Sequence, residues 1–134
     1  MALALLQNLG LDDNATSTRT STVCEPTAAA NDRQLMMTGN WFASTSVDGG
    51  ANWAFLDPFT RFPATAGGFC CDQVVRYNAR HRIWIWLLQY SSTANGDNIF
   101  RVAVCRETQF GNWYYWDFAP RSLNAVSQSK RAAR

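Results

Sequence analysis

The sequence predicts an all-β protein built from two four-stranded antiparallel units. Three observations lead to this fold class. Short apolar and aromatic runs alternate with Gly, Asn, Asp and Pro; a Ser-x-Asp-Gly-Gly segment carries the signals of a tight hairpin turn; and part of the pattern occurs twice. The chain has 134 residues, 47% of them hydrophobic, so it is long enough to bury a core.

The expected folded region is 23–119. Residues 1–22 are predicted to be a flexible lead-in, because a Ser/Thr-rich stretch there shows no sustained periodicity. Residues 120–134 form a polar, basic tail. Within the folded region, the first unit is expected at about 23–58 and the second at about 70–119.

Eight strands are expected, because β-branched and aromatic residues crowd eight short runs that are separated by turn residues. The runs are Pro26–Ala30, Gln34–Met37, Trp41–Ser46 and Trp53–Leu56 in the first unit, and Gln73–Tyr77, Ile83–Gln89, Ile99–Cys105 and Trp113–Phe118 in the second. The run Ile83–Leu88 has no polar alternation, which suits a strand buried on both faces; a core helix is the competing interpretation.

The two units resemble each other. Cys24-Glu25 is matched by Cys71-Asp72, and the pattern N-W-x-[F/Y]-x-D of Asn52–Asp57 recurs intact at Asn112–Asp117. The spacing between matched residues grows along the chain, so the second unit holds extra residues, some near Arg80–Arg82 and most in the polar loop Ser91–Asn98. A repeat of this length is typical of propellers and related arrays.

The turn between the third and fourth expected strands has a physical logic. Gly49 and Gly50 can adopt the positive φ of a tight turn. The Ser46 hydroxyl and the Asp48 carboxylate can accept hydrogen bonds from backbone N–H groups across it. The ring of Trp53 can then cover the hairpin and shield it from water. An ordinary Asp-Gly-Gly hairpin followed by a chance Trp is the simpler alternative.

These residues, Ser46–Trp53, read S-x-D-x-G-x-x-W and closely resemble the Asp-box of sialidase-like BNR-repeat β-propellers. Glu25-Pro26-Thr27 also looks like the E-P-[S/T] element of such repeats. The resemblance covers 23–119 and implies two propeller blades, whereas a closed sialidase-like ring has about six. A fragment, a truncated product, a protomer of a homo-oligomeric ring and a two-blade stack all stay open.

The resemblance leaves two functions open. One is a non-catalytic repeat module with a carbohydrate ligand; the other is an exo-α-sialidase or related glycoside hydrolase, completed by missing blades or by oligomerisation. A sialidase-like site implies three arginines, a Tyr–Glu nucleophile pair and an Asp acid/base. Arg61-Phe62-Pro63 does not match the place of the family's arginine element, and neither Glu25 nor Glu107 lies in a matching motif. No catalytic residue is carried over.

The candidate ligand-binding residues are Glu25, Asp72, Gln73 and Arg76. Both acids open the first expected strand of their unit, and in a propeller such positions face the central channel. The competing interpretation is that the two carboxylates bond backbone N–H groups between the units. Structural bonding is likewise expected for the repeated acids that follow the tryptophans, Asp57 and Asp117.

Five tryptophans could stack on sugar rings, although burial between blades is expected for most of them: Trp41, Trp84, Trp86, Trp113 and Trp116.

Composition argues against several partner classes. A net charge of +2 with scattered arginines does not indicate nucleic acid, and no apolar run approaches the roughly 20 residues of a membrane-spanning helix. The segment Met1–Leu6 lacks the basic start of a signal peptide, although the family resemblance implies secretion. The expected partners are a glycan and further copies of the chain.

Four cysteines and one histidine, with no C-x-x-C pair, give no metal or cofactor prediction. The neighbours Cys70 and Cys71 are not expected to bridge each other, and small buried thiols are favoured. A small secreted protein held by disulfides stays open as a third alternative. His81, between two arginines, is expected to be an exposed turn residue.

Overall fold

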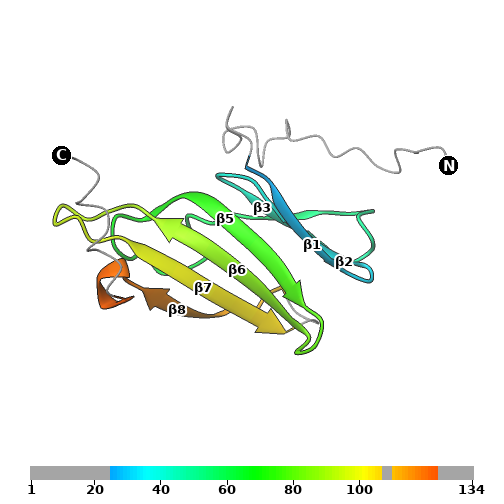
Figure 1. Ribbon diagram of the computed structural model, residues 1–134. Coiled ribbons are helices and arrows are strands. Elements are labelled where there is room, and N and C mark those ends of the chain that lie inside the picture. The colour runs from blue at the N-terminus through cyan, green and yellow to red at the C-terminus, as the bar shows by residue number, and fades with distance from the viewer. Residues whose placement is uncertain (1–24, 107–109, 124–134) are drawn as a thin grey trace.

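The computed structural model describes residues 25–106 and 110–123, which form two four-stranded antiparallel sheets (Figure 1). The all-β prediction is therefore confirmed. The first sheet contains β1 (Thr27–Asn31), β2 (Gln34–Thr38), β3 (Ala43–Ser46) and β4 (Ala54–Leu56), and the second contains β5 (Phe69–Asn78), β6 (Ile83–Tyr90), β7 (Ile99–Arg106) and β8 (Tyr114–Phe118). Strands pair in chain order in both sheets, and one 3-10 turn, η1 (Pro120–Leu123), follows β8.

All eight predicted strands are present, with shifted ends. β3 begins at Ala43 because residues 39–42 turn back on themselves, where the Gly39 N–H donates to the Phe42 carbonyl at 3.1 Å. β5 begins at Phe69, earlier than predicted, and its register with β6 shifts between Phe69 and Gln73. The predictions for residues 1–22 and for the basic end of the tail lie outside the described residues.

The two sheets share one register, which supports the internal repeat. Across the first sheet, Ala28, Met37, Ser44 and Phe55 stand in one row. Across the second, Val75, Trp86, Ala103 and Tyr115 stand in the corresponding row. The first members of the two rows are separated along the chain by the same spacing as the matched residues at the start of the sequence repeat. The last members are separated by the same spacing as the matched residues at its end. The added residues of the second sheet lie in the turn 79–82 and in the longer β6–β7 hairpin, as expected.

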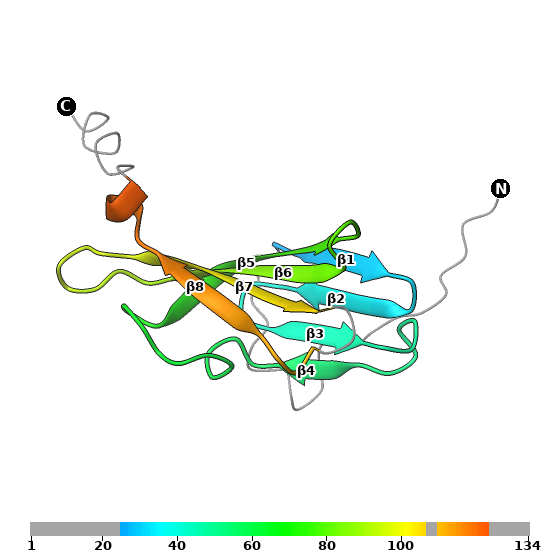
Figure 2. The same cartoon turned by 90° about the horizontal axis from the view of Figure 1, so that it is seen from below.

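The sheets stack through one face of each, called here the inner faces. β1 lies beside β5, as the views of Figure 1 and Figure 2 both show. The first sheet supplies Ala29, Met36, Ala43 and Leu56 to the core, and the second supplies mainly large side chains: Val75, Tyr77, Trp84, Trp86 and Leu88. The Thr27 hydroxyl accepts the Val75 N–H at 2.9 Å, so a polar contact also joins the two sheets.

β6 confirms the strand interpretation of the apolar run 83–88 over the helical one. Trp84, Trp86 and Leu88 are fully buried on the inner face, whereas Ile85 and Leu87 on the opposite face are only half-buried. The expected burial is therefore complete on the inner face only. No described residue of the other sheet covers the opposite face.

The cysteine prediction was wrong at one place. Cys70 and Cys71 form a disulfide with each other, although small unbridged thiols were expected. The two residues lie in the stretch of β5 where the ladder to β6 is irregular, so the strand register does not fix their backbone. Cys105 is free and buried as expected, and Cys24 lies outside the described residues.

Candidate functional site

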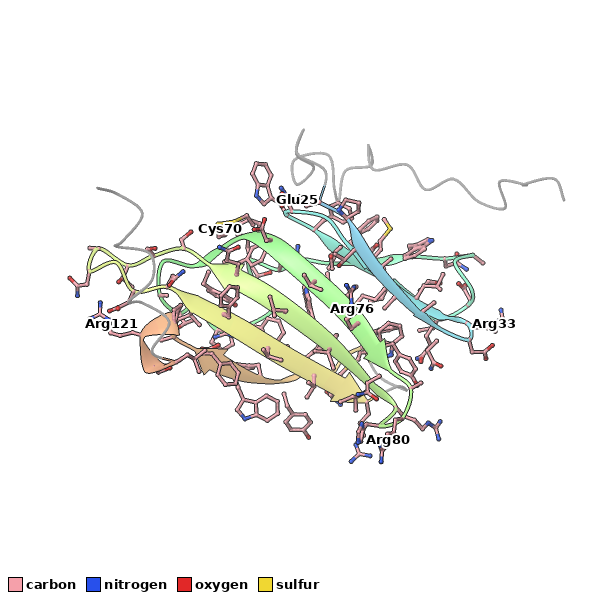
Figure 3. All side chains as sticks on the ribbon, in the orientation of Figure 1. Glu25, Arg33, Cys70, Arg76, Arg80 and Arg121 are labelled. Atoms are coloured by element: carbon pink, nitrogen blue, oxygen red, sulfur yellow. A yellow bond between two sulfur atoms is a disulfide. The ribbon has the colours of Figure 1, made fainter. Side chains whose placement is uncertain are left out.

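Two of the four candidate residues, Glu25 and Asp72, come together at one end of the molecule. Glu25 lies two residues before β1 and Asp72 lies in the irregular part of β5, and both are exposed. A hydrogen bond between the two carboxyl groups raises the pKa of Glu25, and their mutual repulsion adds to the effect. We call this pair the acidic rim. Figure 3 shows Glu25 at the same end as Cys70, away from Arg33 and Arg80.

Gln73 does not face a ligand position. Its side chain is 3% exposed, and its amide nitrogen donates to the carbonyls of Gly39, Asn40 and Phe42 at 2.8–3.2 Å. Its amide oxygen accepts the Trp86 indole N–H at 2.9 Å. The residue therefore ties the β2–β3 loop of the first sheet to the second sheet.

Trp41 projects from that loop. It is 38% exposed, while the loop backbone on both sides of it is held by Gln73, the neighbour of Asp72. An accessible indole therefore lies in the loop that is anchored by Gln73, the sequence neighbour of Asp72. Of the other four tryptophans considered for sugar stacking, Trp84 and Trp86 are fully buried, Trp113 is half-buried and Trp116 is 54% exposed.

Arg76 lies apart from the rim. It is exposed near the C-terminal end of β5, and its guanidinium donates to the Val75 carbonyl at 2.9 Å (Figure 3). The four predicted residues thus divide into an exposed acidic pair, one buried link between the sheets and one separate surface arginine.

The Asp-box segment joins β3 to β4, as predicted, and its polar atoms bond one another. The Ser46 hydroxyl donates to the Asp48 carboxylate at 2.8 Å and accepts the Gly50 N–H at 2.8 Å. The same carboxylate accepts the backbone N–H and the side-chain amide of Asn52 at 2.9 and 2.7 Å. These bonds lower the pKa of Asp48 to about 2. Gly49 and Gly50 have positive φ, as expected.

A buried arginine was missed by the sequence reasoning. Arg101 on β7 is 1% exposed and holds both carboxylate oxygens of Asp117 on β8 at 2.6 and 2.7 Å. It also donates to the Tyr90 hydroxyl and to the Pro63 carbonyl, and the ring of Tyr115 lies 4.2 Å from its guanidinium carbon. The repeated Asp117 was expected to bond structurally, but only the cross-strand register reveals its partner.

Both sheets carry apolar side chains on the faces that point away from the stack. On the second sheet the exposed rings belong to Phe100, Tyr114, Trp116 and Phe118. On the first sheet an apolar groove of about 250 Å³ lies over β1 and β2 and is bounded by Trp53. Neither face is covered by any described residue of the other sheet.

The remaining titratable candidates take structural places. His81 is exposed in the turn 79–82, where its backbone N–H donates to the Asn78 side chain at 3.1 Å. Burial raises the pKa of the Cys105 thiol to about 12, which keeps it protonated. Within residues 25–106 and 110–123, no group of three or more metal-ligating side chains is placed to hold an ion, and no helix is long and apolar enough to span a membrane.

Comparison of the chain with protein-family models, with curated proteins and with solved structures finds no match.

Proposed function

We propose that this chain is a non-catalytic repeat module of the BNR/Asp-box propeller type, which contributes two sheets to a larger stacked assembly. The observation that carries the proposal is the distribution of apolar side chains. Each sheet has one apolar face in the stack and a second apolar face outside it. Contiguous exposed apolar surface of this kind marks an interaction site.

The Asp-box supports a structural role for its own residues. The Ser46 hydroxyl and both Asp48 carboxylate oxygens are bonded inside the hairpin. The motif therefore stabilises the turn that keeps β3 and β4 of the first sheet in register.

A glycan is the ligand that the acidic rim fits best. Two exposed carboxyl groups can bond sugar hydroxyls, and the accessible indole of Trp41 offers a flat apolar face of the kind that stacks on a sugar ring. The rim lies just before β1 and in the irregular first part of β5, and both of its side chains are exposed to a ligand.

A glycosidase is the competing function. The two carboxyl groups of the rim are hydrogen-bonded to each other, which is closer than the roughly 5–9.5 Å that separates the carboxyl pair of most glycosidases. The buried guanidinium of Arg101 cannot clamp a substrate carboxylate either, because Asp117 already occupies its fork. We expect the purified chain to give no hydrolysis of a fluorogenic α-sialoside at any pH from acidic to neutral. Turnover that Asp72→Asn abolishes would overturn the non-catalytic proposal.

Glycan binding is tested by titrating the chain with a panel of sialylated and neutral oligosaccharides and following heat or indole fluorescence. We expect binding that weakens at least tenfold in Trp41→Ala and in Asp72→Asn. Arg80→Ala, at the opposite end of the molecule, is the matched control and should bind like the wild-type chain (Figure 3). Equal affinity in all four proteins would contradict a glycan site at the rim.

A further inference from the structure

The outer face of the second sheet is an aromatic surface. Tyr114, Trp116 and Phe118 alternate along β8 and are 71%, 54% and 39% exposed, and Phe100 beside Phe118 is 38% exposed. Half-buried aliphatic side chains continue the surface across β6 and β7, at Ile85, Leu87, Val102 and Val104. A charged or polar face would be expected if this side of the sheet only met water.

The outer face of the first sheet has the opposite relief. Ala28 and Ala30 leave a hollow beside Leu35 and Met37, and the ring of Trp53 closes one side of it. The volume of about 250 Å³ is accessible from outside and is lined almost entirely by apolar atoms. One face therefore presents large rings, and the other presents a hollow with small side chains.

The shared register of the two sheets says which faces correspond. The row Ala28–Met37–Ser44–Phe55 on the outer face of the first sheet matches the row Val75–Trp86–Ala103–Tyr115 on the inner face of the second. That inner face is covered by the first sheet. The inner face of the first sheet likewise corresponds to the outer face of the second sheet. Within the chain, the inner face of the first sheet covers the inner face of the second. By equivalence, a surface like the outer face of the second sheet should cover the outer face of the first.

From this correspondence, and on the basis of the function proposed above, we propose that the aromatic outer face of the second sheet docks into the alanine-lined groove on the first sheet of another copy of this chain. The contact repeats the stacking already present within the chain. It is head-to-tail, so it leaves a free face of each kind at the two ends and grows until a ring closes. Rings of stacked sheets contain about four to eight sheets. Since each chain supplies two sheets, two to four copies would close a ring.

The exposed rings supply roughly half of the area of a standard interface. Whole aromatic side chains bury about 150–250 Å² each, so the exposed shares of the four rings amount to roughly 300–500 Å². A standard interface buries about 800 Å² per partner. The half-buried aliphatic side chains around the rings supply further area toward that value.

A symmetric contact between two aromatic faces is the main alternative. It would bury the rings of Tyr114 and Trp116 but leave the groove at Ala28 and Ala30 empty. The head-to-tail contact fills both surfaces with one interface, and it is the arrangement that the register predicts.

The test uses one full-length variant for each face. Ala30→Arg places a charge in the groove, and Trp116→Arg places a charge at the centre of the aromatic face; both positions are exposed, so folding should be retained. Each variant keeps one intact face of the opposite kind. We expect each variant alone to be monomeric in sedimentation velocity, and an equimolar mixture to form a heterodimer that cannot grow further.

Three results would overturn the inference. They are a wild-type chain that is monomeric at all concentrations, a mixture in which no heterodimer forms, and an Ala30→Arg variant that associates as the wild type does, which would indicate a symmetric contact between aromatic faces. Circular dichroism checks that each variant folds, and Ala28→Glu with Tyr114→Glu provides a second pair. Failure here leaves the sialoside and glycan results unaffected, so the two proposals are tested separately.

Discussion

Trp53 and Trp113 occupy equivalent positions in the two sheets but bond differently. The Trp113 indole N–H donates to the Phe110 carbonyl at 2.7 Å, and its ring lies 5.4 Å from that of Trp86 inside the stack. The Trp53 indole nitrogen is buried with no hydrogen-bond partner among the described residues, and its ring borders the open groove. The same side chain therefore contributes to a filled interface in one sheet and to an unfilled one in the other.

The carboxylate of Asp48 makes the stability of the first sheet pH-dependent. Its pKa of about 2 in the folded chain lies below the ordinary value of 3.8, so ionised Asp48 stabilises the fold above about pH 4. That contribution is lost as the pH falls from about 4 to 2. We expect the melting temperature to decrease over this range, as followed by circular dichroism.

The control is Asp48→Asn, which keeps one acceptor for the Asn52 N–H but cannot ionise. This variant should be less stable at neutral pH and should lose less stability on acidification than the wild-type chain. Identical pH profiles for the two proteins would show that the hairpin bonds do not stabilise ionised Asp48.

At the scale of the elements, Gln73 is the main polar link between the sheets. Gln73→Leu keeps the size of the side chain but removes the partner of the Trp86 N–H and of the Gly39 carbonyl. Each buried unsatisfied group costs about 1–3 kcal/mol, so we expect a loss of at least that amount in the free energy of unfolding in urea.

The exposed variant Arg76→Gln, three residues along the same strand, should change stability by less than about 0.5 kcal/mol. If Gln73→Leu were as stable as Arg76→Gln, the proposed link between the sheets would be of no energetic importance.

The ion pair of Arg101 and Asp117 holds β7 and β8 together. Removing one partner of a buried pair costs about 3–5 kcal/mol, and because Asp117 is 28% exposed we expect about 2–4 kcal/mol for Arg101→Met. The control is Arg121→Met, which removes the exposed pair with Asp97 and should cost about 0–1 kcal/mol. Equal denaturation midpoints for these two variants would contradict the structural role of Arg101.

Strand positions could be predicted closely because the turn residues are strong local signals. Gly49 and Gly50 mark the β3–β4 hairpin, and the four-residue turn at 79–82 separates two apolar runs. The early start of β5 could not be predicted, since residues 69–72 precede the regular pairing with β6 and their extension depends on contacts distant in the sequence. The disulfide of Cys70 and Cys71 lies in the same stretch and escaped prediction for the same reason.

The candidate site was predictable only in part. The repeat placed Glu25 and Asp72 in equivalent positions, and the structure brings them into contact. Gln73 points to the opposite side of β5 from Asp72 and is buried. This could not be predicted, because the strand was expected to begin only at Gln73. Arg101 carried no sequence signal, because its role depends on a cross-strand pairing with a residue 16 positions away.

At the scale of the whole molecule, each sheet carries an apolar surface on both faces. The inner faces meet within the chain, and the outer faces are the aromatic surface around Trp116 and the groove at Ala28 and Ala30. A chain that carries two complementary apolar faces should associate with itself, and its association should weaken when either face is charged.

Sedimentation equilibrium of the wild-type chain over a range of concentrations tests this claim most directly. We predict a mass that rises with concentration to a limit of two, three or four times the 15.0 kDa of the single chain, as expected for a closed ring. A soluble, folded species of 15.0 kDa at every concentration would contradict the account.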